Sequence, residues 1–163
     1  MSLLEICQWI QDTPIGTQIR ESIWTFPVIE GSHVLGLAIS VGLVFYFDLR
    51  LLGYNMSRRS ISEVRNQILP WAITGFILMT ISGGLLFWAQ AAKAYLSIFG
   101  RIKFFALVLA SFNILAYHGI TEKTIAEWDK APVPPMKVRL AGLFSIILWT
   151  VVVAAGRLMA YTF

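Results

Sequence analysis

The sequence predicts an all-α integral membrane protein, a four-helix bundle that is preceded by a short amphipathic interfacial segment. Three observations support this fold class. Apolar residues make up 57% of the 163 residues and charged residues only 13%, about half the charged share of a soluble domain. Four stretches nearly free of charge each approach the ~20 helical residues that cross a ~30 Å hydrocarbon core. The apolar runs also lack the polar–apolar alternation of a membrane β-barrel.

The predicted elements divide one domain, residues 1–163, into an interfacial segment and four spans. In lipid every backbone polar group needs an internal partner, so each apolar stretch is expected to be helical. The segment before the first span places apolar residues at helical spacing and contains Thr13-Pro14, which is typical of an N-cap followed by proline. The interfacial segment covers 1–26, and the spans cover 27–49, 68–92, 102–121 and 138–161.

Basic residues predict the orientation in the membrane. Two connections hold eight of the 13 lysines and arginines, which are Arg50, Arg58, Arg59, Arg65, Lys123, Lys130, Lys137 and Arg139. The positive-inside rule therefore places both connections in the cytoplasm and both termini outside. The same loops account for the net charge of +4, so we expect the bilayer, and no nucleic acid, to be the partner of these basic residues. The single cysteine, Cys7, excludes an intrachain disulfide and a CxxC motif.

Ionisable residues inside the spans are the candidate site. Glu30 and Arg157 each lie eighteen residues from the predicted cytoplasmic edge of their helices, a height of ~27 Å at 1.5 Å per residue. We therefore expect an ion pair or a shared polar site near the outer face, with separate contacts to headgroups as the alternative. Lys103 opens the third span near the same level. Asn113, midway down that span, is expected to form a hydrogen bond across helices.

The two histidines suggest haem b, because imidazole is the usual axial ligand in helical bundles. Their predicted heights differ by ~14 Å, from span edges and the helical rise, which disfavours one haem held by both His33 and His118. A haem held by one of them, or a quinone bound with Glu30, Arg157 or Lys103, stays open. So does a hydrogen-bonded packing role. Glu30 and His33 also form Glu-x-x-His, a spacing found in metal sites of helix bundles; a second such motif is missing, so a single copper or zinc ion is the metal alternative.

The order of residues along the chain resembles an uncharacterised family of bacterial four-helix inner-membrane proteins. The matching patterns are Ile29-Glu30-x-x-His33, Asp48-Leu-Arg-Leu-Leu-Gly53, Pro70-Trp71 with Gly75, Asn113 with His118, and Ala155-Gly156-Arg157-x-x-Ala160-Tyr161. The resemblance covers nearly the whole chain and implies a location in the bacterial inner membrane, with periplasmic termini. A looser similarity to b-type cytochromes and copper-resistance membrane proteins depends only on helix number and membrane histidines.

Three functions follow from these observations. The first is a redox-linked membrane subunit that binds haem b or quinone near the outer face, and we favour it. The second is a non-catalytic anchor or assembly subunit, with other membrane or periplasmic subunits or a homo-oligomer as partners. The third is copper or cation transport. We find no hydrolase triad, phosphate loop or zincin spacing, which favours an electron-transfer or accessory subunit over a stand-alone enzyme.

Overall fold

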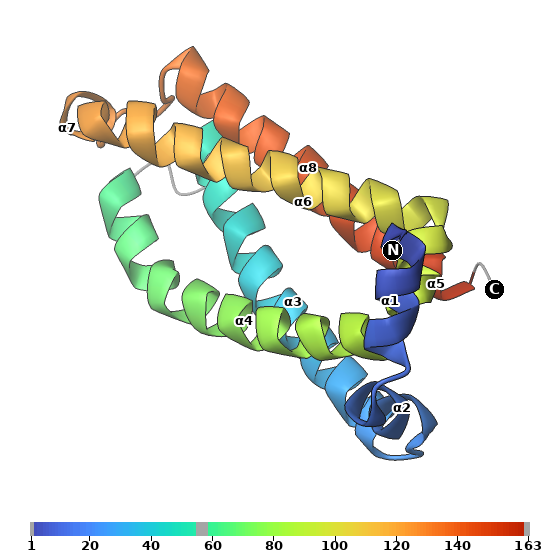
Figure 1. Cartoon of the computed structure of the whole chain (residues 1–163). Helices are drawn as coiled ribbons and strands as arrows, with labels where there is room; N and C mark the ends of the chain where they lie inside the picture. The colour runs from blue at the N-terminus through green and yellow to red at the C-terminus, as the bar shows by residue number, and fades with distance from the viewer. Residues whose placement is uncertain (1, 55–58, 162–163) are drawn as a thin grey trace.

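The structure, a computed structural model, describes residues 2–54 and 59–161, the side chains of 120–122 excepted, and all the elements in them are helical. Each of the four long helices is long and apolar enough to cross a membrane, which confirms the predicted fold class. These helices are α3 (Thr25–Leu52), α4 (Ile61–Ala89), α6 (Ile98–Ala116) and α8 (Met136–Tyr161) (Figure 1). The shorter ones are α1 (Leu3–Gln11), α2 (Pro14–Glu21), α5 (Ala91–Leu96) and α7 (Ile125–Trp128).

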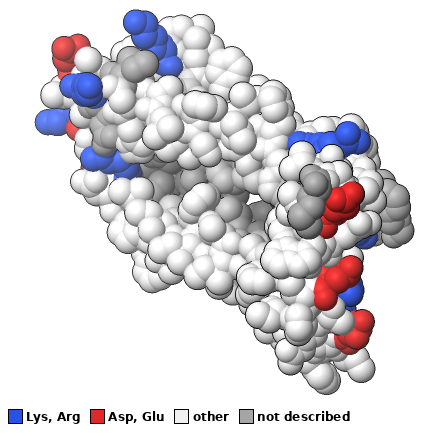
Figure 2. All heavy atoms as spheres, viewed as in Figure 1, with Lys and Arg blue, Asp and Glu red and all other residues white. Residues whose placement is uncertain are grey.

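The bundle has two chemically distinct ends. We call the end that carries α1, α2, α5 and both termini the terminal end, and the end with the α3–α4 and α6–α8 connections the loop end (Figure 1). On the face drawn in Figure 2, charged side chains gather at the two ends and leave an uncharged belt between them. This distribution suits a multi-pass membrane protein, because charges at mid-membrane depth are costly. Arg58, one of the basic residues used above, lies outside the described residues.

The two N-terminal helices begin as the sequence predicts. The Thr13 hydroxyl accepts a hydrogen bond from the Gly16 amide at 3.3 Å, and Pro14 occupies the first position of α2. The Trp88 indole donates to the same hydroxyl at 2.8 Å, which ties this turn to the end of α4. The position of these helices in the membrane interface stays a prediction.

Helices α3 and α4 cross at two glycines. A Cβ atom added to Gly36 would lie 2.8 Å from the Met79 amide nitrogen and 2.9 Å from the Gly75 carbonyl oxygen, and one added to Gly75 would lie 2.8 Å from the Ser40 amide nitrogen. The backbones are therefore in direct contact, as expected for small residues at a helix interface in lipid. Asn113 forms the expected bond across helices, donating to the Ala141 carbonyl of α8 at 3.0 Å.

The helices do not pack evenly around the bundle. Helix α3 packs along both α4 and α8, and α6 packs along α8. Towards the loop end, α4 diverges from α6 (Figure 1). A buried core fills the middle, formed by Val41, Met79, Ala106, Ala110, Trp149 and Val152.

Candidate functional site

At the terminal end, His33 is built into the contact between α3 and α4. Its Nδ1 atom lies 2.9 Å from the Met79 carbonyl oxygen and 3.2 Å from the Ser82 hydroxyl. Because a carbonyl only accepts, Nδ1 donates this hydrogen bond, and Nε2 keeps a lone pair in the neutral ring. A Cβ atom at Gly83 would approach His33 Cε1 to 2.9 Å. Gly83 therefore makes room for the imidazole itself.

The other charged candidates at this end are loosely arranged. Lys103 and Glu30 lie close enough to His33 for their charges to act on its ring. The Lys103 amino group packs over Gly156, where an added Cβ would lie 3.2 Å from Nζ. The Arg157 guanidinium stands over the Tyr161 ring, 5.7 Å from its centroid. Glu30 and Arg157 are both described residues, and they do not form the expected ion pair; the structure shows one between Arg59 and Glu63 at the loop end.

A second polar group, at the loop end, is more deeply buried. Asp48 is 4% exposed, and its Oδ2 atom has no hydrogen-bond partner. Ser145 on α8 lies near the same carboxyl group. Tyr117, at the end of α6, is 8% exposed, and its hydroxyl also lacks a partner. A buried polar atom without a partner is rare in native proteins and is consistent with a missing ligand.

Both groups line one cavity of about 300 Å³ between α3, α4, α6 and α8. Most of its lining is apolar, and three large aromatic side chains, Phe47, Phe76 and Trp149, are among its walls. The polar lining residues are Ser40, Asp48, Arg65, Asn113, Tyr117, His118 and Ser145. Figure 2 shows the surface hollowed between α4 and α6, on the uncharged belt. We call this space the loop-end cavity; it opens sideways, towards the position of the lipid.

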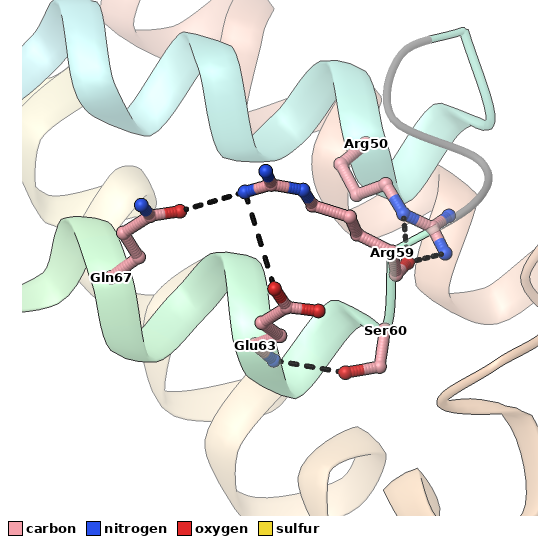
Figure 3. Close-up of polar contacts among 5 residues, drawn as sticks. All are labelled: Arg50, Arg59, Ser60, Glu63 and Gln67. Carbon is pink, nitrogen blue, oxygen red and sulfur yellow. Dashed lines mark hydrogen bonds and ion pairs between the residues drawn. The ribbon is translucent and has the colours of Figure 1, made fainter.

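Arg50, two residues after Asp48 on α3, is fully buried at the loop end. Its Nη2 and Nε atoms donate to the Arg59 carbonyl at 2.8 and 3.2 Å, and Nη2 also donates to the Ala131 carbonyl at 3.3 Å. Figure 3 shows the Arg50 guanidinium at the Arg59 carbonyl oxygen, directly before Ser60, whose hydroxyl caps the start of α4. Asp129 caps α4 from the other connection, accepting from the Ser62 amide at 2.7 Å. The two connections are thus fastened to each other and to α3.

The two histidines do not share a site. His118 is exposed on a π-helical turn, η1 (Tyr117–Thr121), where its ring meets Tyr117 edge to face at 5.4 Å. It lines the loop-end cavity, whereas His33 does not. Within the described part of the chain, no three His, Cys, Asp or Glu side chains are grouped as metal ligands. The roles predicted for Glu30, His33, Lys103, Arg157 and His118 stay predictions.

Sequence reasoning missed Asp48 and Tyr117. Asp48 was named above only in the pattern Asp48-Leu-Arg-Leu-Leu-Gly53, next to the predicted end of the first span at residue 49. Helix α3 continues to Leu52, so the carboxyl group lies one turn inside the helix. A signal was present: Gly36, Ser40 and Asp48 are separated by multiples of four residues, so they belong to one ridge of side chains that winds along the helix. Small residues on this ridge are typical of helix contact in lipid, and extending the ridge to Asp48 predicts a side chain near neighbouring helices.

A model of a family of unknown function, DUF6644, matches residues 17–162. No curated protein and no solved structure matches the chain. The family match covers most of the sequence, so the chain belongs to this family. The expected membership of an uncharacterised family is confirmed.

Proposed function

We propose that this chain, a member of the DUF6644 family of unknown function, is a redox-linked membrane subunit that binds a quinone headgroup in the loop-end cavity. One observation carries the proposal: the buried Asp48 carboxyl and Tyr117 hydroxyl both have unsatisfied hydrogen-bonding capacity in one apolar cavity. Small-molecule sites are typically ~300–1,000 Å³, mostly apolar, with a few polar groups that orient the ligand.

A quinone fits this combination of groups. Its headgroup is flat and uncharged, which suits a cavity with the aromatic walls Phe47, Phe76 and Trp149. Its carbonyl oxygens accept hydrogen bonds, and Tyr117 has a hydroxyl to donate. Its isoprenoid tail would leave through the side opening between α4 and α6 and remain in lipid. The cavity lies in the half of the bundle that the positive-inside rule assigns to the cytoplasmic leaflet.

This proposal keeps the redox-linked function expected from the sequence but places the ligand at the opposite end. We place it there because the hydrogen bond from His33 Nδ1 to the Met79 carbonyl already explains why that imidazole packs, half-buried, between α3 and α4. The electron donor or acceptor would be another membrane or periplasmic subunit of a bacterial inner membrane. A haem on His33 or His118 remains a separate prediction, which a reduced-minus-oxidised visible spectrum of the purified protein tests.

Filling the cavity tests the proposal. Ala72 lines it from α4, whereas Ala38 lies exposed on α3 outside it. Overpacking costs about 1–3 kcal/mol, so Ala72→Phe should weaken binding of a short-chain alkyl benzoquinone about tenfold or more. Ala38→Phe should bind like the wild type. Titration calorimetry in lipid nanodiscs measures both affinities. Absence of binding to the wild type, or equal losses in both variants, would contradict the proposal.

A further inference from the structure

We infer that Asp48 binds the quinone as a neutral carboxylic acid, which donates its proton to a ligand carbonyl oxygen beside the Tyr117 hydroxyl. The inference rests on the proposed function and adds the protonation state on which binding depends. It also defines the ligand class: the site selects an uncharged headgroup with carbonyl acceptors over a cationic one. Binding of such a ligand is then linked to pH.

The surroundings of Asp48 favour the neutral acid. The side chain is 4% exposed, and no ion pair to it is formed by the residues that the structure describes. An ionised carboxylate that is buried without a counter-charge is strongly unfavourable, and such groups take up a proton instead. The neutral acid has an O–H to donate, and Oδ2, the oxygen without a partner, is available to carry it.

The charged and titratable groups around Asp48 do not supply that counter-charge. On α3 itself, Arg50 is directed away, to the carbonyls of Arg59 and Ala131. Arg65 lines the cavity from α4, where its charge acts on Tyr117. The α8 side of the lining consists of uncharged residues. Among the described residues, the charged or titratable groups that line the cavity with Asp48 are Arg65, Tyr117 and His118. Arg50 on α3 and Arg139 on α8 are outside the lining.

Tyr117 is oriented as the second donor. Its ring packs edge to face against Phe47, with centroids 6.1 Å apart and planes at 87°, and against His118 on its other side. These contacts fix the ring while the hydroxyl has no partner. The Asn113 amide in the same cavity already donates to the Ala141 carbonyl. Among the described lining residues, Asp48 and Tyr117 are the two that have a buried polar atom without a partner.

The first test is the pH dependence of wild-type binding. A ligand that binds only the protonated form loses affinity as the pH rises and the empty site ionises, by up to tenfold per pH unit. We expect the affinity of a short-chain alkyl benzoquinone in nanodiscs to fall from pH 6 to pH 9. An alkylamine of the same chain length should bind weakly throughout. Affinity that is independent of pH or rises with it would overturn the inference.

The second test uses Asp48→Asn, which keeps a donor of nearly the same size but does not ionise. We expect this variant to retain benzoquinone binding within about threefold and to lose the pH dependence, while Asp48→Leu binds about tenfold more weakly, as for one lost hydrogen bond. Glu63→Gln, an exposed carboxyl on α4, is the matched control and should retain the wild-type pH profile. If Asp48→Asn does not fold, the pH dependence of benzoquinone binding to the wild type still tests the inference.

The outcomes separate the two proposals. Failure of the wild type to bind benzoquinone at any pH removes the proposed function itself. Binding that Ala72→Phe blocks, but that has the same pH profile in the wild type and in Asp48→Asn, leaves the proposed function and removes the role of Asp48. Tight alkylamine binding that Asp48→Asn abolishes would show a carboxylate that pairs with a cationic ligand, which also overturns the inference.

Discussion

Buried polar residues in this bundle differ in whether their hydrogen-bonding groups find partners. His33 donates to a backbone carbonyl of α4. Arg50 donates from Nε and Nη2 to backbone carbonyls of the two connections, while its Nη1 atom has no partner. Asp48 and Tyr117 each keep a buried oxygen without a partner. A donor that is paired with a buried carbonyl has a structural role, because its removal would leave that carbonyl without a hydrogen bond. An unpartnered buried group costs free energy. Of the described residues with such a group, Asp48 and Tyr117 are the two that line the loop-end cavity, which directs attention to a ligand there.

Arg50 is expected to be essential for stability. Arg50→Leu leaves the carbonyls of Arg59 and Ala131 without their donor, at about 1–3 kcal/mol for each buried group. We expect the free energy of unfolding to fall by about 2–4 kcal/mol, with little recovery in Arg50→Lys because an ammonium lacks the planar fork. Denaturant titration in detergent measures the change. Arg59→Leu, which removes an exposed side chain and keeps the carbonyl, is the control.

Gly83 is expected to tolerate no side chain while His33 is present. A Cβ there would meet His33 Cε1 at 2.9 Å, whereas the space beside Gly84 is open within 4 Å. Gly83→Ala should therefore lower stability by about 1–3 kcal/mol, and Gly84→Ala should be neutral or slightly stabilising. The double variant His33→Ala, Gly83→Ala should recover part of the loss. Equal melting temperatures for the two single variants would contradict this account.

At the scale of helices, contacts between backbones hold α3 and α4 together near the middle of the membrane. Beyond that crossing towards the loop end, α4 diverges from α6 (Figure 1). The loop-end cavity occupies this divergence, and the Arg50 fork and the Asp129 cap fasten the start of α4 below it. The element that carries one cavity wall is thus fixed at its glycine crossing and at its N-terminus.

The glycine crossing gives a prediction with a control on the same helix. Gly36→Ala would place a Cβ 2.8 Å from the Met79 backbone, which has no flexible side chain to move, whereas Gly42 has nothing within 4 Å. We expect Gly36→Ala to reduce the unfolding free energy by about 1–3 kcal/mol and to separate α3 from α4. Gly42→Ala should retain the wild-type value. Thermal unfolding in detergent compares the two variants.

For the whole molecule, both termini lie at one end and the α7 connection lies at the other (Figure 1). Charged residues at both ends with an uncharged belt between them are consistent with four passes through a bilayer (Figure 2). The loop-end cavity opens on that belt, so a ligand dissolved in lipid reaches it without crossing water. The leaflet in which the cavity lies depends on the orientation of the protein in the membrane. The distribution of basic residues predicts that orientation.

Cysteine labelling tests the orientation. In a Cys7→Ser background, Glu21→Cys places a thiol at the exposed end of α2, and Glu127→Cys places one on exposed α7. The positive-inside rule predicts that a membrane-impermeant maleimide labels Glu21→Cys on intact bacterial cells and Glu127→Cys only after lysis. The opposite pattern would place the loop-end cavity in the outer leaflet.

The sequence by itself determined what depends on local composition. The length and apolarity of four stretches require helices in lipid, Thr13-Pro14 specifies a helix start, and the small residues on the first span predict close helix contact. Family membership is likewise carried by the linear order of residues. None of these properties requires knowing which helices are neighbours.

Only the tertiary structure decided which hydrogen-bond partners each polar side chain has. Asp48 and Arg50 are two residues apart, yet Arg50 meets carbonyls of two connections while Asp48 faces a cavity. The sequence marks His33 as a candidate ligand, and only the packed bundle shows that its Nδ1 atom donates to the Met79 carbonyl of α4. Whether a buried polar group finds a hydrogen-bond partner depends on atoms that other segments contribute. It is therefore a property of the packed bundle and not of the local sequence.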